Sequence, residues 1–156
     1  MRQLDRTDRR ILGILQEDAS LPVAEVAARV GLSQTPCWRR IQRLRSEGVI
    51  ERTVSLVRPE AIGLGLTVFI AIEARDHSPD WLDNFTREVA AMPEVLDVYR
   101  MAGDVDYMLR VAVADMAAFD TFYRALIAAI PLKNVSSHFA MERVKSTTAY
   151  PVEPAA

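Results

Sequence analysis

The sequence predicts an α+β chain divided into two domains, residues 1–60 and residues 61–156. Apolar residues recur at helical spacing in the first part, whereas β-rich stretches alternate with helical ones in the second. The charge changes at the same place, since residues 1–60 carry a net charge of +3 and residues 61–156 a net charge of −5. These observations predict a basic helical domain followed by an acidic domain that contains a sheet.

The composition is that of an ordinary globular protein, with 50% hydrophobic and 26% charged residues among 156. No stretch is apolar for long enough to span a bilayer, and the charged N-terminus is unlike a signal peptide. The single cysteine, Cys37, excludes an internal disulfide and a cysteine-based zinc site. We therefore expect a cytoplasmic protein with no cofactor, no metal and no membrane partner.

Three helices are predicted in the first domain. The first begins at Asp5, because Asp8 three residues later completes a pattern typical of helix starts. The second follows Pro22, and the third is capped by Ser33 and ends near Glu47. Their apolar faces comprise, in turn, Leu4, Ile11, Leu12 and Leu15; Val23, Val26, Ala27 and Val30; and Cys37, Ile41 and Leu44.

The link between the second and third helices is too short for anything but a tight turn. Gly31 can adopt the positive φ that such a turn needs, and the small Ala27 lets the two helices approach. The helices must then cross steeply, which is the geometry of a helix-turn-helix. The third helix would be its recognition helix.

The region from residue 29 to residue 58 holds seven arginines and two glutamates, a net charge of +5. The third helix places arginines away from its apolar stripe, namely Arg39, Arg40 and Arg43. Charged faces are usually only solvated, but the planar arginine group suits phosphates and guanine edges. The same helix begins with short polar side chains that could meet base edges, namely Ser33, Gln34 and Thr35. This pattern predicts binding of double-stranded DNA.

Two further features of this domain are less specific. Trp38 lies at the margin of the apolar stripe, where packing is favoured over a base contact. Residues 49–57 alternate in polarity and include Arg52, a pattern that indicates the strands of a wing beside the DNA backbone. The first domain is thus predicted to be a winged helix-turn-helix.

The second domain follows a joint at Gly63 and Gly65. Its predicted elements are a strand over 66–74, a helix over 78–92, strands over 95–101 and 107–113, a helix over 115–130 and a strand from 135 to about 149. The inward helical residues are Trp81, Leu82, Phe85, Val89 and Met92, then Phe119, Phe122, Leu126, Ile127 and Ile130. This order predicts a ferredoxin-like βαββαβ domain with both helices on one face. A homodimer could cover the other face, and its paired recognition helices would read a pseudo-palindromic site with half-sites roughly 34–36 Å apart.

Two carboxylates of the second domain lie in one predicted turn, where Asp104 and Asp106 follow Gly103. Aspartates in a turn usually serve the turn itself. Neither His77 nor His138 has the partners of a general base or a metal ligand, so an enzyme is not favoured. Such a loop could hold the ammonium and carboxylate groups of an amino acid.

The chain resembles the Lrp/AsnC family of leucine-responsive and asparagine-responsive regulators over nearly its whole length. The matching stretches are residues 4–8 with 11–12, 32–40, 48–50, 102–104 with 106–107, and 141–142 with 144–145. The resemblance implies a transcription regulator, associated with the nucleoid, that forms homodimers and usually octamers or other multimers of dimers. It also implies an effector site at the contact between dimers.

Carried over by position, that effector site would use Met101, Gly103, Asp104, Asp106, Ser137 and His138, with Arg100 beside them. Arg100 and His138 depart from the apolar or aromatic residues expected there, which favours a polar or acidic effector over a leucine-like one. Two other functions stay open: an enzyme built on the sheet dimer, and a DNA-bending protein with little sequence preference. We expect a sequence-specific regulator whose DNA binding or assembly responds to an amino acid.

Overall fold

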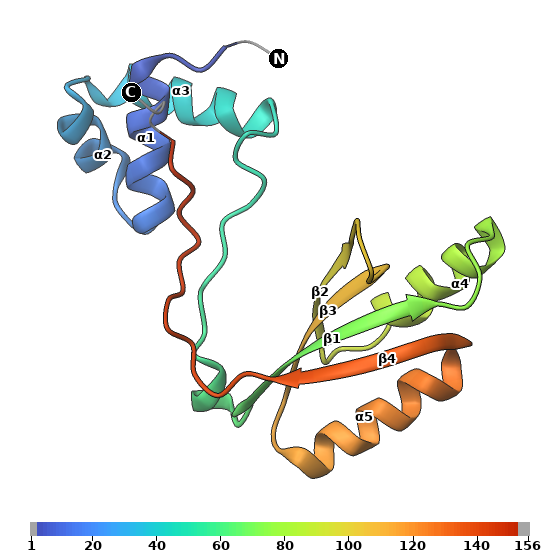
Figure 1. Ribbon diagram of the computed structural model, residues 1–156. Helices are drawn as coiled ribbons and strands as arrows, with labels where there is room; N and C mark the ends of the chain where they lie inside the picture. The colour runs from blue at the N-terminus through green and yellow to red at the C-terminus, as the bar shows by residue number, and fades with distance from the viewer. Residues whose placement is uncertain (1–2, 153–156) are drawn as a thin grey trace. The chain divides into compact units, whose positions relative to one another are not determined.

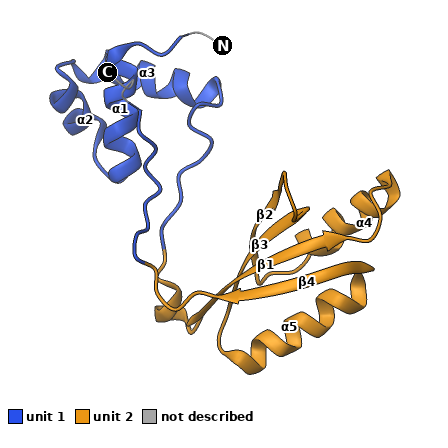
Figure 2. Ribbon diagram, in the orientation of Figure 1, with its two compact units in different colours: residues 1–56, 144–156 blue, residues 57–143 orange. Residues whose placement is uncertain are grey.

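The computed structural model describes residues 3–152 (Figure 1). Residues 1–2 and 153–156, the outer ends of the two predicted domains, lie outside the described residues. The chain divides into two compact units, coloured separately in Figure 2. Unit 1 comprises residues 1–56 and 144–156, and unit 2 comprises residues 57–143.

Unit 1 contains three helices, α1 (Arg6–Glu17), α2 (Val23–Val30) and α3 (Gln34–Ser46). Asp5 and Asp8 form a reciprocal capping box at the start of α1. Gly31 ends α2 at φ 76°, a left-handed conformation in which a β-carbon would be strained. The fully or nearly buried residues are Ile11, Leu12, Val26, Ala27, Val30, Cys37, Ile41 and Leu44. The predicted helix-turn-helix and its apolar faces are confirmed.

The C-terminal segment packs on α1 as part of unit 1, whereas the sequence placed it in the second domain. The Gln16 side chain donates to the Tyr150 carbonyl at 3.2 Å and accepts from the Tyr150 N–H at 2.8 Å. Arg9 donates to the Val152 carbonyl at 2.8 Å, and the Val152 side chain packs against the core of the unit beside Gly13. We call residues 144–152 the tail.

Residues 51–58 adopt no strand, so the predicted wing is wrong. Polarity does alternate in this segment, but Val54, Leu56 and Val57 are all more than half exposed. An alternating pattern produces a strand only where a neighbouring strand supplies hydrogen bonds and one face is covered. Within the described part of the chain, this segment has no such strand beside it.

Unit 2 contains η1 (Pro59–Ile62), β1 (Leu66–Ala74), α4 (Pro79–Ala90), β2 (Val95–Arg100), β3 (Tyr107–Val113), α5 (Met116–Ala129) and β4 (Leu132–Phe139). The strands form one antiparallel sheet in the order β2-β3-β1-β4, which is the predicted ferredoxin-like arrangement. The last strand ends at Phe139 rather than near residue 149. Phe139 pairs with Val68 and β1 begins at Leu66, so the ladder could extend by only two more residues and could not reach residue 149.

Both helices cover the same face of the sheet, because alternate residues of β1 and β3 enter one buried core with them. The rings of Trp81, Phe85 and Tyr107 pack together within it, with centroids 4.4 to 5.9 Å apart. Ile127 is an exception to the predicted core, since it is 46% exposed. It follows Leu126 by one residue, and a helix turns each successive side chain to a different side.

The other face of the sheet carries two rows of side chains that run across the strands. Register places Asp97, Arg110, Phe69 and His138 in one row, and Tyr99, Met108, Ala71 and Ser136 in the next. Arg110 Nε lies 2.5 Å from Asp97 Oδ2, while the rings of Phe69 and Tyr99 are 39% and 57% exposed. We call these two rows the open face of the sheet.

Replacing Val152 with Asp should loosen α1, because it puts a carboxylate where an apolar side chain meets the core of unit 1. We expect a loss of roughly 1–3 kcal/mol in the local stability of that unit. Hydrogen exchange of the α1 amides would measure it, with Tyr150→Ala as the control, since the Tyr150 side chain is 80% exposed. Equal protection of α1 in Val152→Asp and the native chain would contradict the packing role of the tail.

Candidate functional site

The first half of α3 presents an exposed polar surface. Ser33 is the N-cap residue in an extended conformation, yet its hydroxyl makes no capping hydrogen bond, contrary to expectation. Trp38 is 50% exposed, so the favoured interpretation of this residue as core packing is wrong. Five exposed residues here carry polar or aromatic groups, namely Ser33, Gln34, Thr35, Trp38 and Arg39, and we call them the recognition surface.

This surface combines chemistry that suits base edges. Gln34 and Trp38, like Thr35 and Arg39, are four residues apart and therefore neighbours on the helix. Together they offer an amide, a hydroxyl, an indole and a guanidinium from adjacent turns at the start of one helix. Helix starts of this kind enter the major groove of DNA in helix-turn-helix proteins.

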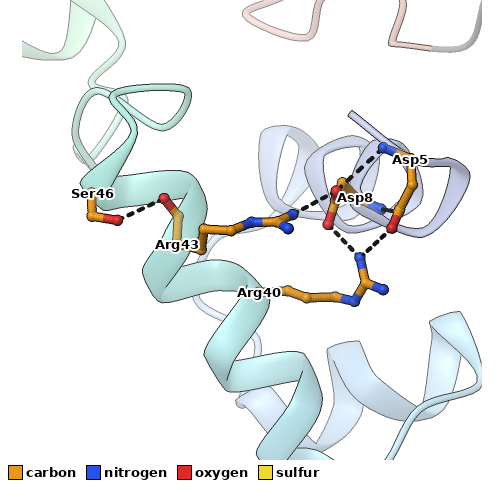
Figure 3. Close-up of polar contacts among 5 residues, drawn as sticks. All are labelled: Asp5, Asp8, Arg40, Arg43 and Ser46. Carbon is orange, nitrogen blue, oxygen red and sulfur yellow. Dashed lines mark hydrogen bonds and ion pairs between the residues drawn. The ribbon is translucent and has the colours of Figure 1, made fainter. Parts of the chain in front are cut away.

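The other predicted arginines of α3 point to α1 instead, as Figure 3 shows. Arg40 Nη1 lies 2.6 Å from Asp5 Oδ2 and 2.7 Å from Asp8 Oδ1. Arg43 Nη2 lies 2.6 Å from Asp8 Oδ2. These four residues form the carboxylate–arginine cluster. The expected free basic face is therefore corrected. Of its three arginines, only Arg39 is exposed, since the side chains of the other two are about 30% exposed and paired with carboxylates.

Asp8 is the centre of the cluster, because it is 1% exposed and so almost completely buried. A buried carboxylate is tolerated only when charged or hydrogen-bonding partners replace its water. Asp8 has two arginines as partners, and its Oδ2 also accepts from the Asp5 N–H at 3.3 Å. The same side chain thus closes the capping box of α1 and attaches α3 to α1.

The pKa of Asp5 is lowered from its ordinary 3.8, first by the hydrogen bond from Arg40 and then by the Asp8 N–H. The pKa of Arg40 is raised, chiefly by its hydrogen bonds to Asp5 and Asp8. A lowered carboxyl pKa stabilises the folded state above the unfolded value and loses that effect as the pH falls through the folded value. Asp5 and Arg40 are therefore both charged at neutral pH, and the contribution of Asp5 to stability is lost in acid.

The spacing of Asp5 and Asp8 predicts only a helix start, and their role as arginine partners is not apparent from the sequence. The two carboxylates are 32 to 38 residues away from the arginines along the chain, and α3 itself contains no acidic residue. Their spacing signals a cap, and only the packing of α1 against α3 reveals the second role. Arg52 lies in the extended segment after α3, with its side chain 75% exposed and 4.0 Å from Glu51.

The predicted effector residues of the β2–β3 turn lie together. Gly103 has φ 125°, which favours glycine, and the Met101 N–H donates to the Asp106 carbonyl at 2.8 Å. Asp106 Oδ2 accepts from the Ala74 N–H at 2.8 Å, so this aspartate helps to hold the turn against β1. Arg100, Met101 and Asp104 are exposed around it.

Ser137 and His138 are not brought to that turn within one chain. They lie on β4, and the strand order puts β1 and β3 between β4 and β2. Strands in a sheet are about 4.8 Å apart, so roughly 14 Å separates β4 from β2. His138 belongs to the open face and Ser137 to the face that carries the helices. The predicted effector residues thus form two separate groups in the single chain.

A separate groove of about 380 Å³ lies between α5 and the start of β4, and none of the predicted effector residues lines it. Beside it, Glu73 forms an ion pair with Lys133 at 2.9 Å and accepts from Asn134 at 3.0 Å. Residues 3–152 contain no group of three or more His, Cys, Asp or Glu side chains arranged to hold a metal. In the same range, no helix is long and apolar enough to cross a membrane.

Comparison with known families matches both parts of the chain. Residues 4–45 match the AsnC-type helix-turn-helix domain, and residues 67–150 match the Lrp/AsnC ligand binding domain. The chain is 47% identical over 151 residues to the DNA-binding transcriptional activator DecR of Escherichia coli strain K12, covering 96% of this chain and 99% of the relative. It is 45% identical over 152 residues to the glutamate uptake regulatory protein of Zymomonas mobilis, covering 97% and 93%.

Solved structures of similar sequence have the same fold. An AsnC family transcriptional regulator from Agrobacterium tumefaciens is 53% identical, with a TM-score of 0.93 over 96% of this chain and 97% of that one. A transcriptional regulator from Neisseria meningitidis, solved in complex with L-methionine, is 35% identical, with a TM-score of 0.92 and the same coverage.

Arg39→Ala and Arg43→Ala should differ in their effect on the fold. Arg39 is exposed, so its loss should leave thermal stability unchanged and weaken DNA binding by about 1–3 kcal/mol. Arg43→Ala removes a partner of buried Asp8 and should cost about 1–3 kcal/mol of folding free energy, since Arg40 still pairs with that carboxylate. Thermal or urea unfolding would measure the stability of both variants. Equal loss of stability would contradict the assignment of Arg43 to the fold and of Arg39 to DNA binding alone.

Proposed function

This chain belongs to the Lrp/AsnC family of transcription regulators. We propose which residues of its two units bind DNA, the effector and a second chain. It is a DNA-binding transcription regulator with a ligand-binding domain and not an enzyme. The observation that carries the assignment to particular residues is the exposed start of α3 on a helix-turn-helix whose turn depends on Gly31. We assign unit 1 to DNA and unit 2 to effector and self-association.

The recognition surface is proposed to read the DNA bases. Gln34 and Thr35 offer hydrogen bonds to base edges, Arg39 can bind a guanine or a phosphate, and Trp38 can pack on a thymine methyl group. Arg40 and Arg43 act mainly through the cluster that orients α3, and Arg52 supplies backbone contacts from the extended segment. Because the DNA of a bacterial cell lies in the cytoplasm, we place the protein there, with the nucleoid.

The effector is proposed to be an amino acid bound near the β2–β3 turn. Exposed Asp104 could pair with its ammonium group and exposed Arg100 with a carboxylate, which favours a polar or acidic side chain. The L-methionine complexes of two structural neighbours support an amino acid as the ligand class. Since Ser137 and His138 lie far from this turn in one chain, a second chain would have to bring them to it.

Self-association is proposed to begin at the open face. Phe69, Ala71, Tyr99 and Met108 give this face an apolar centre, and the Asp97–Arg110 pair lies beside it. Two such faces can pack in a homodimer that repeats each contact by two-fold symmetry. Paired recognition helices then fit a pseudo-palindromic site, and further association of dimers, as in an octamer, would complete the effector site.

The function can be tested by fluorescence anisotropy with a duplex from the upstream region of the protein's own gene and a scrambled duplex, over a salt series and with each amino acid added. We expect selective binding that an amino acid modulates, and loss of that modulation in Asp104→Ala without loss of binding. Salt-sensitive binding without selectivity would instead indicate a DNA-bending protein of little sequence preference.

Phe69→Asp should dissociate the dimer, because two carboxylates would be buried near each other at the centre of the proposed interface. Light scattering after size exclusion would give the mass, and circular dichroism would verify the fold. Ile127→Asp is the matched control, since Ile127 is similarly exposed but lies on α5. A dimer that survives Phe69→Asp, or dissociates equally in both variants, would rule out this interface.

A further inference from the structure

We propose that Asp5 limits the affinity of this protein for the phosphates of any DNA sequence by neutralising Arg40. The inference rests on the proposed role of α3 in DNA binding. It assigns to the N-cap residue of α1, outside the recognition surface, an effect on how strongly the protein binds DNA phosphates.

The cluster reduces the positive charge that α3 can offer to phosphates. The helix contains Arg39, Arg40, Arg43 and Arg45 and no acidic residue. Two of these cations are bound by two carboxylates at 2.6 to 2.7 Å, so the cluster as a whole is neutral. Half of the arginine charge of the helix is therefore compensated within the protein.

Phosphate contacts and base contacts contribute differently to DNA binding. Non-specific affinity comes almost entirely from cations that neutralise phosphates, whereas contacts to base edges distinguish one sequence from another. Holding Arg40 away from phosphates therefore weakens binding to specific and non-specific sequences alike.

Asp5 is the member of the cluster that can be changed without losing the fold. Its side chain is 50% exposed, whereas that of Asp8 is 2% exposed. Asp5 Oδ1 accepts the Asp8 N–H at 2.8 Å as the N-cap, and asparagine is an equally good N-cap. Asp5→Asn thus removes one negative charge, leaves Arg40 with Asp8 alone, and gives the cluster a net positive charge.

The test compares Asp5→Asn with the native chain on a scrambled duplex over a salt series. We expect binding that is tighter by several fold. The slope of log affinity against log salt should be steeper by about 0.9, the value for one more phosphate contact. Asp18→Asn is the matched control: it makes the same charge change in unit 1, but Asp18 is bonded to Ser20 at the other end of α1. The double variant Asp5→Asn with Arg40→Gln should return the slope to the native value.

An unchanged slope in Asp5→Asn, or an equal change in Asp18→Asn, would overturn the inference while leaving the proposed function intact. A native chain that binds neither duplex would instead overturn the proposed function. Hydrogen exchange of α1 verifies that the cap survives, and Asp5→Ser, which also keeps an N-cap oxygen without the charge, should give the same result as Asp5→Asn.

Discussion

The buried carboxylate of Asp8 is the interaction on which the DNA-binding unit depends. It completes the capping box of α1 and accepts hydrogen bonds from both Arg40 and Arg43 of α3. Without those arginines, its burial would be unfavourable by several kcal/mol, so the packing of α3 against α1 depends on these ion pairs. The same ion pairs occupy Arg40 and Arg43, so they determine which arginines of α3 remain available to DNA.

Most of the fold could be predicted from local pattern. Residues 66–74 and 107–113 were predicted as strands with the bounds that the structure has, because each combines β-branched and aliphatic residues with clear stop signals. The helix caps at Asp5, Ser78 and Asp115 were likewise recognisable, since capping depends on residues three apart. Such features need no knowledge of distant parts of the chain.

The features that could not be predicted depend on residues far apart in sequence. Arg40 was assigned to a free basic face because its partner Asp5 is 35 residues away. Residues 51–58 have the alternation of a strand but no partner strand, and Trp38 lies at a boundary between core and surface that helical spacing alone does not resolve. The separation of Ser137 from the β2–β3 turn follows from the strand order, which local pattern does not specify.

The tail has a consequence for how the protein is made. A ribosome synthesises α1, α2 and α3 first and the whole sheet unit next, and only then the residues that pair with Gln16 and cover Gly13. A nascent chain can form the three helices early, but their surface around Gly13 stays uncovered until the effector domain has been translated. The DNA-binding unit therefore reaches its final stability only in chains that already carry the ligand-binding domain.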